Sequence, residues 1–327
     1  MNAIASRRQS HGGIADQLRD FGPAFGMLAV LVLFAIIKPS FASPANIANV
    51  LHQSVVLVIM AFGLGIVMAM RGVDLSVAQI ADCAGLIAAV LMLHREPLWV
   101  VLLVPLAFGL VVGLVNGLLA AYAGIPAIIG TLGMMFVIRS GELLMTNGAE
   151  PQILFTLPRG FTKPFFFIGQ GWIGPVSALI LLGLAVLAIM IVVTGYTSFA
   201  RRARAVGGNF RAAYLAGVDV RGVFAGGFVL SGVLASIAGV ALVSRTSIAM
   251  PRGAEPYLLD AFAAVYLGTL LSRRGEITIL GTLVGALFIT FLGNGLTLLG
   301  LGAPYRYALN GGFILLAMAV GALKKNQ

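Results

Sequence analysis

The chain has 327 residues, of which 60% are apolar and only 10% are charged, and its mean hydropathy is +1.03. This composition lies outside the range of globular domains and indicates an integral membrane protein, with room for roughly ten spans of about 20 residues. The net charge of +10 does not indicate a nucleic-acid-binding protein, because the basic residues lie in short segments between apolar runs. Cys83 is the single cysteine, which excludes an intrachain disulfide.

A polar segment is followed by a series of apolar runs. Residues 1–20 are too polar to span a bilayer and are predicted to form a cytosolic N-terminal tail. One all-α transmembrane domain is expected over 21–322, with a cytosolic C-terminal tail over 323–327. Ten spans are predicted within the domain, at 21–37, 50–70, 75–93, 98–122, 126–146, 173–194, 223–243, 257–271, 277–299 and 305–322.

The distribution of Lys and Arg predicts the orientation of these spans. With the N-terminus inside, the cytosolic loops and tails carry 13 of the 21 basic residues, and the other eight lie outside or near outer span ends. This asymmetry favours an orientation with both termini in the cytosol. The connection over 146–172 is then external, and its prolines and aromatic residues are typical of a membrane interface.

The connection before the third span carries Arg71, Asp74 and Ser76. One interpretation is a polar break in the bundle that contributes to a path for a polar solute. The alternative is that Asp74 caps the third span and pairs with Arg71, which is a common device and is favoured by the sequence alone. Asp74 and Ser76 are also taken as candidates for the path.

Other ionisable residues lie within the predicted spans. Asp82 is about two turns into the third span and should face protein or water rather than lipid. Arg139 and Glu142 are three residues apart on the fifth span, a spacing that predicts a local ion pair near the outer face.

A long charged segment, residues 195–222, separates the sixth and seventh spans and carries five arginines. A short surface helix is predicted over 209–217, because Asn209 is a good N-cap, the body is rich in alanine and Gly217 is a typical stop. One alternative is an ordinary cytosolic loop whose arginines only fix the orientation.

A weak internal repeat links the two halves of the chain. The sequence Asn116-Gly117-Leu118, with Gly124 and Pro126, recurs 178 residues later as Asn294-Gly295-Leu296 with Gly302 and Pro304. The two copies end the fourth and ninth predicted spans, which run in opposite directions, and Asp74 and Asp260 open the third and eighth. Spans 2–5 and 7–10 are therefore predicted to form two inverted four-helix repeats.

Catalytic and nucleotide-binding patterns are absent from the sequence. The histidines are scattered without an HExxH motif, and no lysine ends a GxxxxGK loop. We therefore expect no metal, cofactor or ATP site in this chain, and any ATP must be bound by another protein.

Several stretches resemble the ribose-type sugar permeases of ABC importers, in the expected order from about residue 45 to 320. These stretches are GVDLSV at 72–77, IPAIIGTLGMMFVIRSG at 125–141, LLDAFAAVYLG at 258–268, GTLVGALFITFLGNGL at 281–296 and much of 197–218. The chain departs from the family pattern at Arg71, at Leu258 and at the TLLSRR sequence over 269–274, which puts the substrate in doubt more than the mechanism.

The resemblance implies a permease dimer, identical or pseudo-symmetric, in a bacterial cytoplasmic membrane, with cytosolic ATP-binding subunits that bind ATP and magnesium and a periplasmic solute-binding protein. It maps the family's segment that couples to the ATPase onto 201–218, within the cytosolic coupling segment over 195–222. The residues expected to make this coupling are Arg201, Arg204, Gly207, Gly208, Asn209, Arg211, Ala212, Ala213 and Gly217. Both glycines are expected to permit a close backbone approach.

The resulting hypothesis is a permease subunit for a small polar solute, a monosaccharide or related polyol, without enzymatic activity of its own. The residues expected along the path are Asp74, Ser76, Asn116, Asp260 and Asn294. The alternatives are an ABC permease for a non-sugar solute, an ion-coupled secondary transporter, which requires a buried acid-base relay, and an intramembrane enzyme, which requires a catalytic set.

Overall fold

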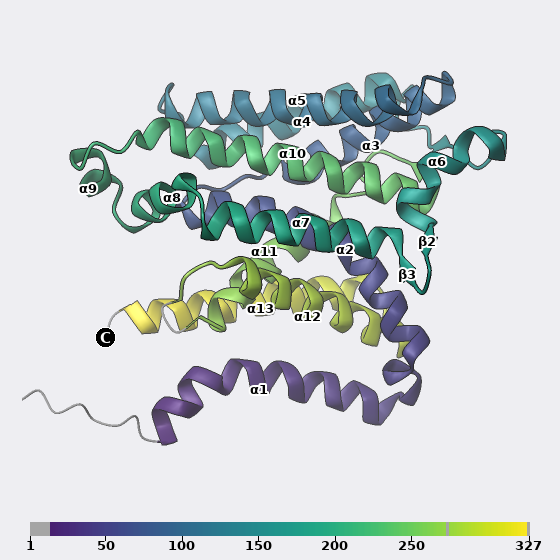
Figure 1. Cartoon of the computed structure of the whole chain (residues 1–327). Helices are drawn as coiled ribbons and strands as arrows, with labels where there is room; N and C mark the ends of the chain where they lie inside the picture. The colour runs from purple at the N-terminus through teal and green to yellow at the C-terminus, as the bar shows by residue number, and fades with distance from the viewer. Residues whose placement is uncertain (1–13, 273–274, 326–327) are drawn as a thin grey trace, which may run out of the picture.

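The computed structural model describes residues 14–272 and 275–325, and this part of the chain is almost entirely helical. Figure 1 shows most helices running side by side along one direction, as in a membrane bundle. The elements are α1 (Ile14–Ile37), η1 (Pro39–Ala42), α2 (Pro44–Ala69), α3 (Val77–Leu93), α4 (Leu98–Ala121), α5 (Ala127–Met145), β1 (Gln152–Ile153), α6 (Arg159–Gln170), β2 (Trp172–Ile173), β3 (Val176–Ser177), α7 (Ala178–Gly195), α8 (Ser198–Gly208), α9 (Phe210–Leu215), α10 (Val220–Thr246), β4 (Ile248–Ala249), α11 (Pro256–Leu270), α12 (Ile279–Leu298) and α13 (Ala303–Lys325).

Each predicted span coincides with a helix, and the differences at the ends have local causes. The second helix begins before residue 50 because the Ser43 hydroxyl accepts a hydrogen bond from Asn46 N at 3.3 Å and Pro44 occupies the first turn. The sixth predicted span begins late, at Ala178, because β2 and β3 form a hairpin and the Ser177 hydroxyl caps α7. The helix α1 begins at Ile14, within the predicted tail, and residues 1–13 and 326–327 lie outside the described part.

Among the described residues, six helices are long and apolar enough to cross a membrane. These are α2, α4, α5, α7, α10 and α12. The chain is thus an all-α membrane protein, and the apolar stretch of α1 together with α3 and α11 are shorter apolar helices beside these six.

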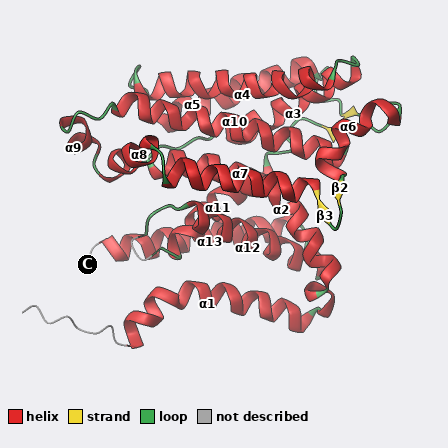
Figure 2. Cartoon of the chain, viewed as in Figure 1, coloured by secondary structure: helices red, strands yellow, loops and turns green. Residues whose placement is uncertain are grey.

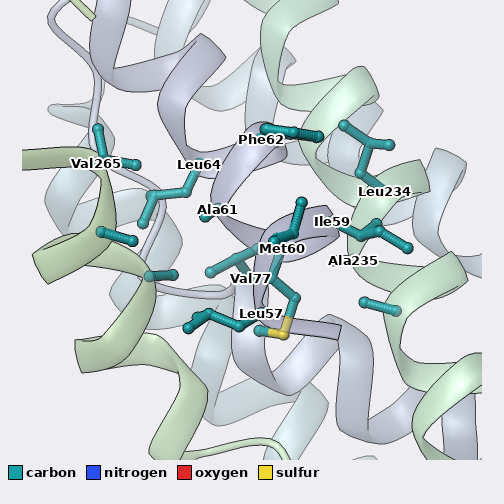
Figure 3. Packing of buried hydrophobic residues seen from close by; sticks show 14 of the residues in the cluster. Leu57, Ile59, Met60, Ala61, Phe62, Leu64, Val77, Leu234, Ala235 and Val265 are labelled. Carbon is teal, nitrogen blue, oxygen red and sulfur yellow. The ribbon is translucent and has the colours of Figure 1, made fainter. Parts of the chain in front are cut away.

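The helix α2 forms the centre of the bundle. In the most apolar 18-residue stretch of α2, 83% of the residues are buried, whereas the corresponding share in α5 is only 17%. The low share in α5 is the burial expected of a helix facing lipid. Figure 3 shows the middle of α2, including Met60 and Phe62, packed against Val77 of α3, Leu234 of α10 and Val265 of α11. A helix whose middle is apolar and buried needs protein around it, and α7, α10, α11 and α12 supply most of the contacts to α2.

The helices α4 and α10 cross with their backbones in close contact. A Cβ atom on Gly109 would lie 2.3 Å from the carbonyl oxygen of Gly232, and one on Gly232 would lie 2.1 Å from the carbonyl oxygen of Gly109. Real Cβ contacts are essentially never this short, so both positions require glycine. Small residues at such crossings let helices approach closely, which is a main source of packing energy in lipid.

The two ends of the bundle differ in their connections. Figure 1 shows α8 and α9 at one end, together with the beginning of α1 and the end of α13, and shows α6, β2 and β3 at the other. Figure 2 shows that the strands lie in the connections at the end that carries α6, where β1 also pairs with β4. The helix α6 was not predicted, although the interfacial character of this connection was.

Candidate functional site

The charged segment between α7 and α10 folds into two short helices. Asn209 lies between them and caps α9, because its side-chain oxygen accepts a hydrogen bond from Ala212 N at 3.0 Å. Gly217, with a φ of +80°, follows the end of α9 and adopts the left-handed conformation that favours glycine. The predicted helix over 209–217 is confirmed, and α8 is an additional helix that packs against α10 and α2.

Of the two adjacent glycines at the end of α8, only one makes the predicted close approach. A Cβ atom on Gly207 would lie 2.0 Å from the carbonyl oxygen of Ala69, at the end of α2, whereas one on Gly208 would meet nothing within 4 Å. The carbonyl oxygen of Gly208 instead accepts a hydrogen bond from Arg71 Nη2 at 2.8 Å. The end of α8 is therefore attached to the end of α2 and to the connection that follows α2.

The face of α9 directed away from the bundle is apolar, a feature that the sequence analysis missed. Phe210, Tyr214 and Leu215 are 52%, 65% and 77% exposed, although Ala213 of the same helix is buried. Large apolar side chains exposed at the end of a bundle indicate an interaction surface when polar residues surround them. Their spacing in the sequence marks one apolar side of the helix but does not show whether that side meets the bundle.

The arginines of this segment are exposed, and Arg204 has a defined partner on the neighbouring helix α7. Its Nη1 atom donates to the carbonyl oxygen of Thr194 at 2.7 Å, in the last turn of α7. Arg201, Arg202 and Arg211 are exposed at the same end of the molecule. This end consequently combines an apolar face on α9 with surrounding positive charge.

Three of the five predicted path residues lie together in a buried polar cluster. The carboxylate of Asp74 accepts hydrogen bonds from the Ser76 hydroxyl at 2.7 Å and the backbone N of Ser76 at 3.0 Å, and from the Ser231 hydroxyl of α10 at 2.8 Å. Asn116 Nδ2 of α4 donates to the Ser76 hydroxyl at 2.8 Å. The cluster fastens the connection over 70–76 to α4 and α10, and all four residues are at most 1% exposed.

The favoured interpretation of Asp74 as a partner of Arg71 is wrong. Arg71 donates to the carbonyl oxygen of Gly208, and the described residues include no ion pair between Arg71 and Asp74. The helix α3 begins at Val77, so Asp74 lies in the connection before it and accepts hydrogen bonds from Ser76, at the N-cap position. The helix α10, distant in sequence, supplies the second partner, which no local pattern could reveal.

Asp260 and Asn294 belong to other contacts. The carboxylate of Asp260 accepts hydrogen bonds from Arg306 and Asn310 of α13, two residues that the sequence analysis did not select. Asn294 and Asn46 exchange hydrogen bonds at 2.8 and 3.1 Å, which join α12 to the start of α2. The five predicted path residues therefore occupy three separate places in the described structure.

Two predictions about ionisable residues in the spans are confirmed. Arg139 and Glu142 form an ion pair at 3.0 Å, and Asp82 is buried by protein rather than exposed to lipid. Asp82 Oδ1 accepts a hydrogen bond from the backbone N of Ala254 at 2.6 Å, so α3 holds the connection that precedes α11.

The chain is similar to known transport proteins over nearly its whole length. Residues 46–318 match the family described as branched-chain amino acid transport system / permease component. The chain is 35% identical to the ribose import permease protein of Escherichia coli, over 91% of this chain and 93% of that protein. It is 31% identical to the galactose/methyl galactoside import permease protein of Salmonella typhimurium (91% and 93%) and 31% identical to an L-arabinose ABC transporter permease protein of Azospirillum brasilense (99% and 94%). No solved structure matches the chain significantly.

These relatives are subunits that transport a solute and are not enzymes. Their similarity covers both the apolar bundle and the segment over 195–222, and the bundle contains the long apolar helices that a multi-pass protein of the bacterial cytoplasmic membrane requires. The chain therefore belongs to the family of ABC importer permeases described as branched-chain amino acid transport system / permease component, as a membrane-spanning transport subunit.

Proposed function

We propose that the chain is the permease of an ABC importer that carries a monosaccharide. The observation that supports the solute class is its identity of 31–35% to permeases named for ribose, galactose and L-arabinose, along nearly the full length of each. The family description names branched-chain amino acids, so a non-sugar solute is the competing candidate.

The proposed coupling route begins at α9. Its exposed apolar face and the residues from Arg201 to Gly217 dock on an ATP-binding subunit, which holds ATP and magnesium, and this chain requires no cofactor. Movement of α8 is passed to α2 through the contact of Gly207 with Ala69, and to the connection over 70–76 through the hydrogen bond of Arg71 with Gly208. That connection contains Asp74, so the cytosolic docking segment is linked mechanically to the buried cluster on α4 and α10.

Four of the five path residues, all except Asn294, are proposed to become accessible only when the bundle rearranges. Asp74, Ser76 and Asn116 are closed off from solvent in this structure, and Asp260 is 1% exposed. Hydroxyl, amide and carboxylate groups such as these can replace the water around the hydroxyl groups of a sugar. We propose that the solute passes along the axis between two permease chains, after delivery by a periplasmic binding protein.

The proposed topology has ten spans, with both termini in the cytosol and two inverted halves, α2–α5 and α10–α13. The contacts support this symmetry: α3 packs on α4 and α5 as α11 packs on α12 and α13, while α10 packs on α3 and α4 as α2 packs on α11 and α12. The predicted repeat of Asn116 and Asn294 falls on α4 and α12, which are equivalent in this scheme.

An accessibility scan with single added cysteines tests this topology. We expect residues 201–218 to react with a membrane-impermeant thiol reagent only from the cytosolic side, and residues 150–170 only from the periplasmic side, because the two segments lie at opposite ends of the bundle. The buried Cys83 is first replaced by alanine so that it gives no background labelling. Labelling of 201–218 from outside would refute both the orientation and the coupling assignment.

A reconstituted uptake assay tests the function. We expect proteoliposomes that contain the permease and the ATPase to accumulate labelled ribose, galactose or arabinose in their lumen. For this result the cytosolic face of the permease and the ATP are in the lumen, and the binding protein is outside. The purified chain alone should hydrolyse no ATP, because it has no phosphate-binding loop. Accumulation of leucine or valine in place of every sugar would support the non-sugar alternative, and uptake driven by an ion gradient without ATP would overturn the proposal.

A further inference from the structure

A cavity of about 760 Å³ lies beside the coupling segment, at the end of the bundle that carries α8 and α9. Its walls come from the last turns of α2, the inner face of α8, the end of α11 and the beginning of α12. The volume is within the range of about 300–1,000 Å³ that is typical of sites for small organic molecules. The predicted path residues do not line this cavity, which is therefore separate from the proposed path.

The walls of the cavity have the two kinds of surface that an amphiphile needs. Ile66, Phe199 and Leu270 supply apolar surface, and Thr194 and Thr278 supply polar atoms. Arg71 and Arg204 line the same cavity and come from different elements. A ligand that fits these walls must combine an apolar portion with a charged group.

The two arginines favour a negative charge on that ligand. Each guanidinium donates one hydrogen bond to a backbone carbonyl oxygen, Arg71 to Gly208 at 2.8 Å and Arg204 to Thr194 at 2.7 Å. These bonds fix both side chains at the cavity and leave the other guanidinium nitrogen atoms without a partner among the described residues. Glu276 is the acidic residue among the lining residues that are described, so positive charge prevails there. Guanidinium groups held in this way bind phosphate oxygens through strong, charge-assisted hydrogen bonds.

We propose that this cavity binds the headgroup of an anionic phospholipid from the cytosolic leaflet. The phosphate lies between Arg71 and Arg204, and the glycerol and the first acyl carbons lie against Ile66 and Phe199. Basic pockets between membrane helices on the cytosolic side suit such headgroups. The position in the cytosolic leaflet rests on the orientation given under the proposed function. A bound lipid would stabilise the packing of α8 against α2, next to the contact of Gly207 with Ala69 that is proposed to transmit movement from the ATPase.

Lipid binding by the purified full chain tests this inference directly. The chain is placed in phosphatidylcholine nanodiscs with increasing fractions of phosphatidylglycerol, and bound lipid is measured by native mass spectrometry alongside thermal unfolding. We expect saturable retention of phosphatidylglycerol, weakened about tenfold or more in Arg204→Gln and in Arg71→Gln, because each loses a charge-assisted hydrogen bond. Arg202→Gln is the matched control, since Arg202 is an exposed arginine of α8 that does not line the cavity. Glu276→Gln should retain the lipid more tightly.

Three outcomes would overturn the inference. Equal weakening by Arg202→Gln would show general attraction to a basic surface. If inorganic phosphate raised the temperature of thermal unfolding as much as phosphatidylglycerol does, the site would be one for a free anion, because the apolar wall would then contribute nothing. Retention unchanged in both cavity variants would show that the lipid binds elsewhere. The readout is binding rather than uptake, so failure of the proposed transport function would be recognised separately.

Discussion

Replacing Gly207 with valine is expected to lower ATP-driven uptake by about tenfold or more while the chain still inserts into the membrane. A Cβ atom at this position would lie 2.0 Å from the carbonyl oxygen of Ala69, a backbone atom that cannot rotate away. The end of α8 must move off α2, and the hydrogen bond of Arg71 with the adjacent Gly208 is lost with it. Overpacking of a tight contact costs about 1–3 kcal/mol, so we expect uptake to fall about tenfold or more. The measurement is sugar uptake and ATP hydrolysis in proteoliposomes.

Gly208→Val is the matched control for this prediction. The sequence analysis expects close approach at both glycines, but a Cβ atom on Gly208 has nothing within 4 Å and its φ is not in the left-handed region. We expect Gly208→Val to retain most of the uptake, and Gly207→Val to continue hydrolysing ATP with little transport if the ATPase still docks. Normal uptake by Gly207→Val would remove Gly207 from the coupling route.

Replacing Asp74 with alanine is expected to destabilise the bundle and to abolish transport. The substitution leaves the buried hydroxyl groups of Ser76 and Ser231 without their acceptor and detaches the connection over 70–76 from α10. A buried polar group left without a partner costs about 1–3 kcal/mol, and two groups are affected here. We expect the apparent melting temperature of the detergent-purified chain to fall by several degrees or more, as measured by fluorescence-detected size exclusion after heating.

Two further variants separate the structural role of Asp74 from a role in the path. Ser231→Ala removes one hydrogen bond to the carboxylate and should lower the stability by about 1 kcal/mol without a comparable loss of uptake. Asp74→Asn keeps the shape and one acceptor oxygen, and should be more stable than Asp74→Ala. If Asp74→Asn folds as well as the original chain but does not transport the sugar, the carboxylate itself acts in the path. If Asp74→Ala were as stable as the original chain, the hydrogen bonds of Asp74 to Ser76 and Ser231 would not stabilise the bundle as described.

The helices were predictable because hydropathy and capping are local properties. Every span predicted from an apolar run coincides with a helix, and Asn209 and Gly217 correctly marked the two ends of α9. The burial of Asp82 and the pairing of Arg139 with Glu142 also followed from local arguments, namely the cost of an exposed charge in lipid and helical spacing.

The parts that could not be predicted depend on contacts between distant segments. The partner Ser231 of Asp74 is on α10, and the partner of Arg71 is at the end of α8, so no spacing rule links either pair. Arg306 was overlooked for the same reason, since its contact with Asp260 joins two separate helices. The exposed face of α9 required knowledge of which side of a short helix meets the bundle.

The glycine-to-glycine crossing of α4 and α10 also determines when the bundle can be completed during synthesis. Gly109 is translated more than one hundred residues before Gly232, so α4 enters the membrane with its contact face unoccupied. A face built for backbone contact offers lipid little area, and it gains its packing energy only when α10 arrives. A nascent chain that ends before residue 246 therefore contains α4 without its full partner, and the packing energy of this crossing is not yet available to it.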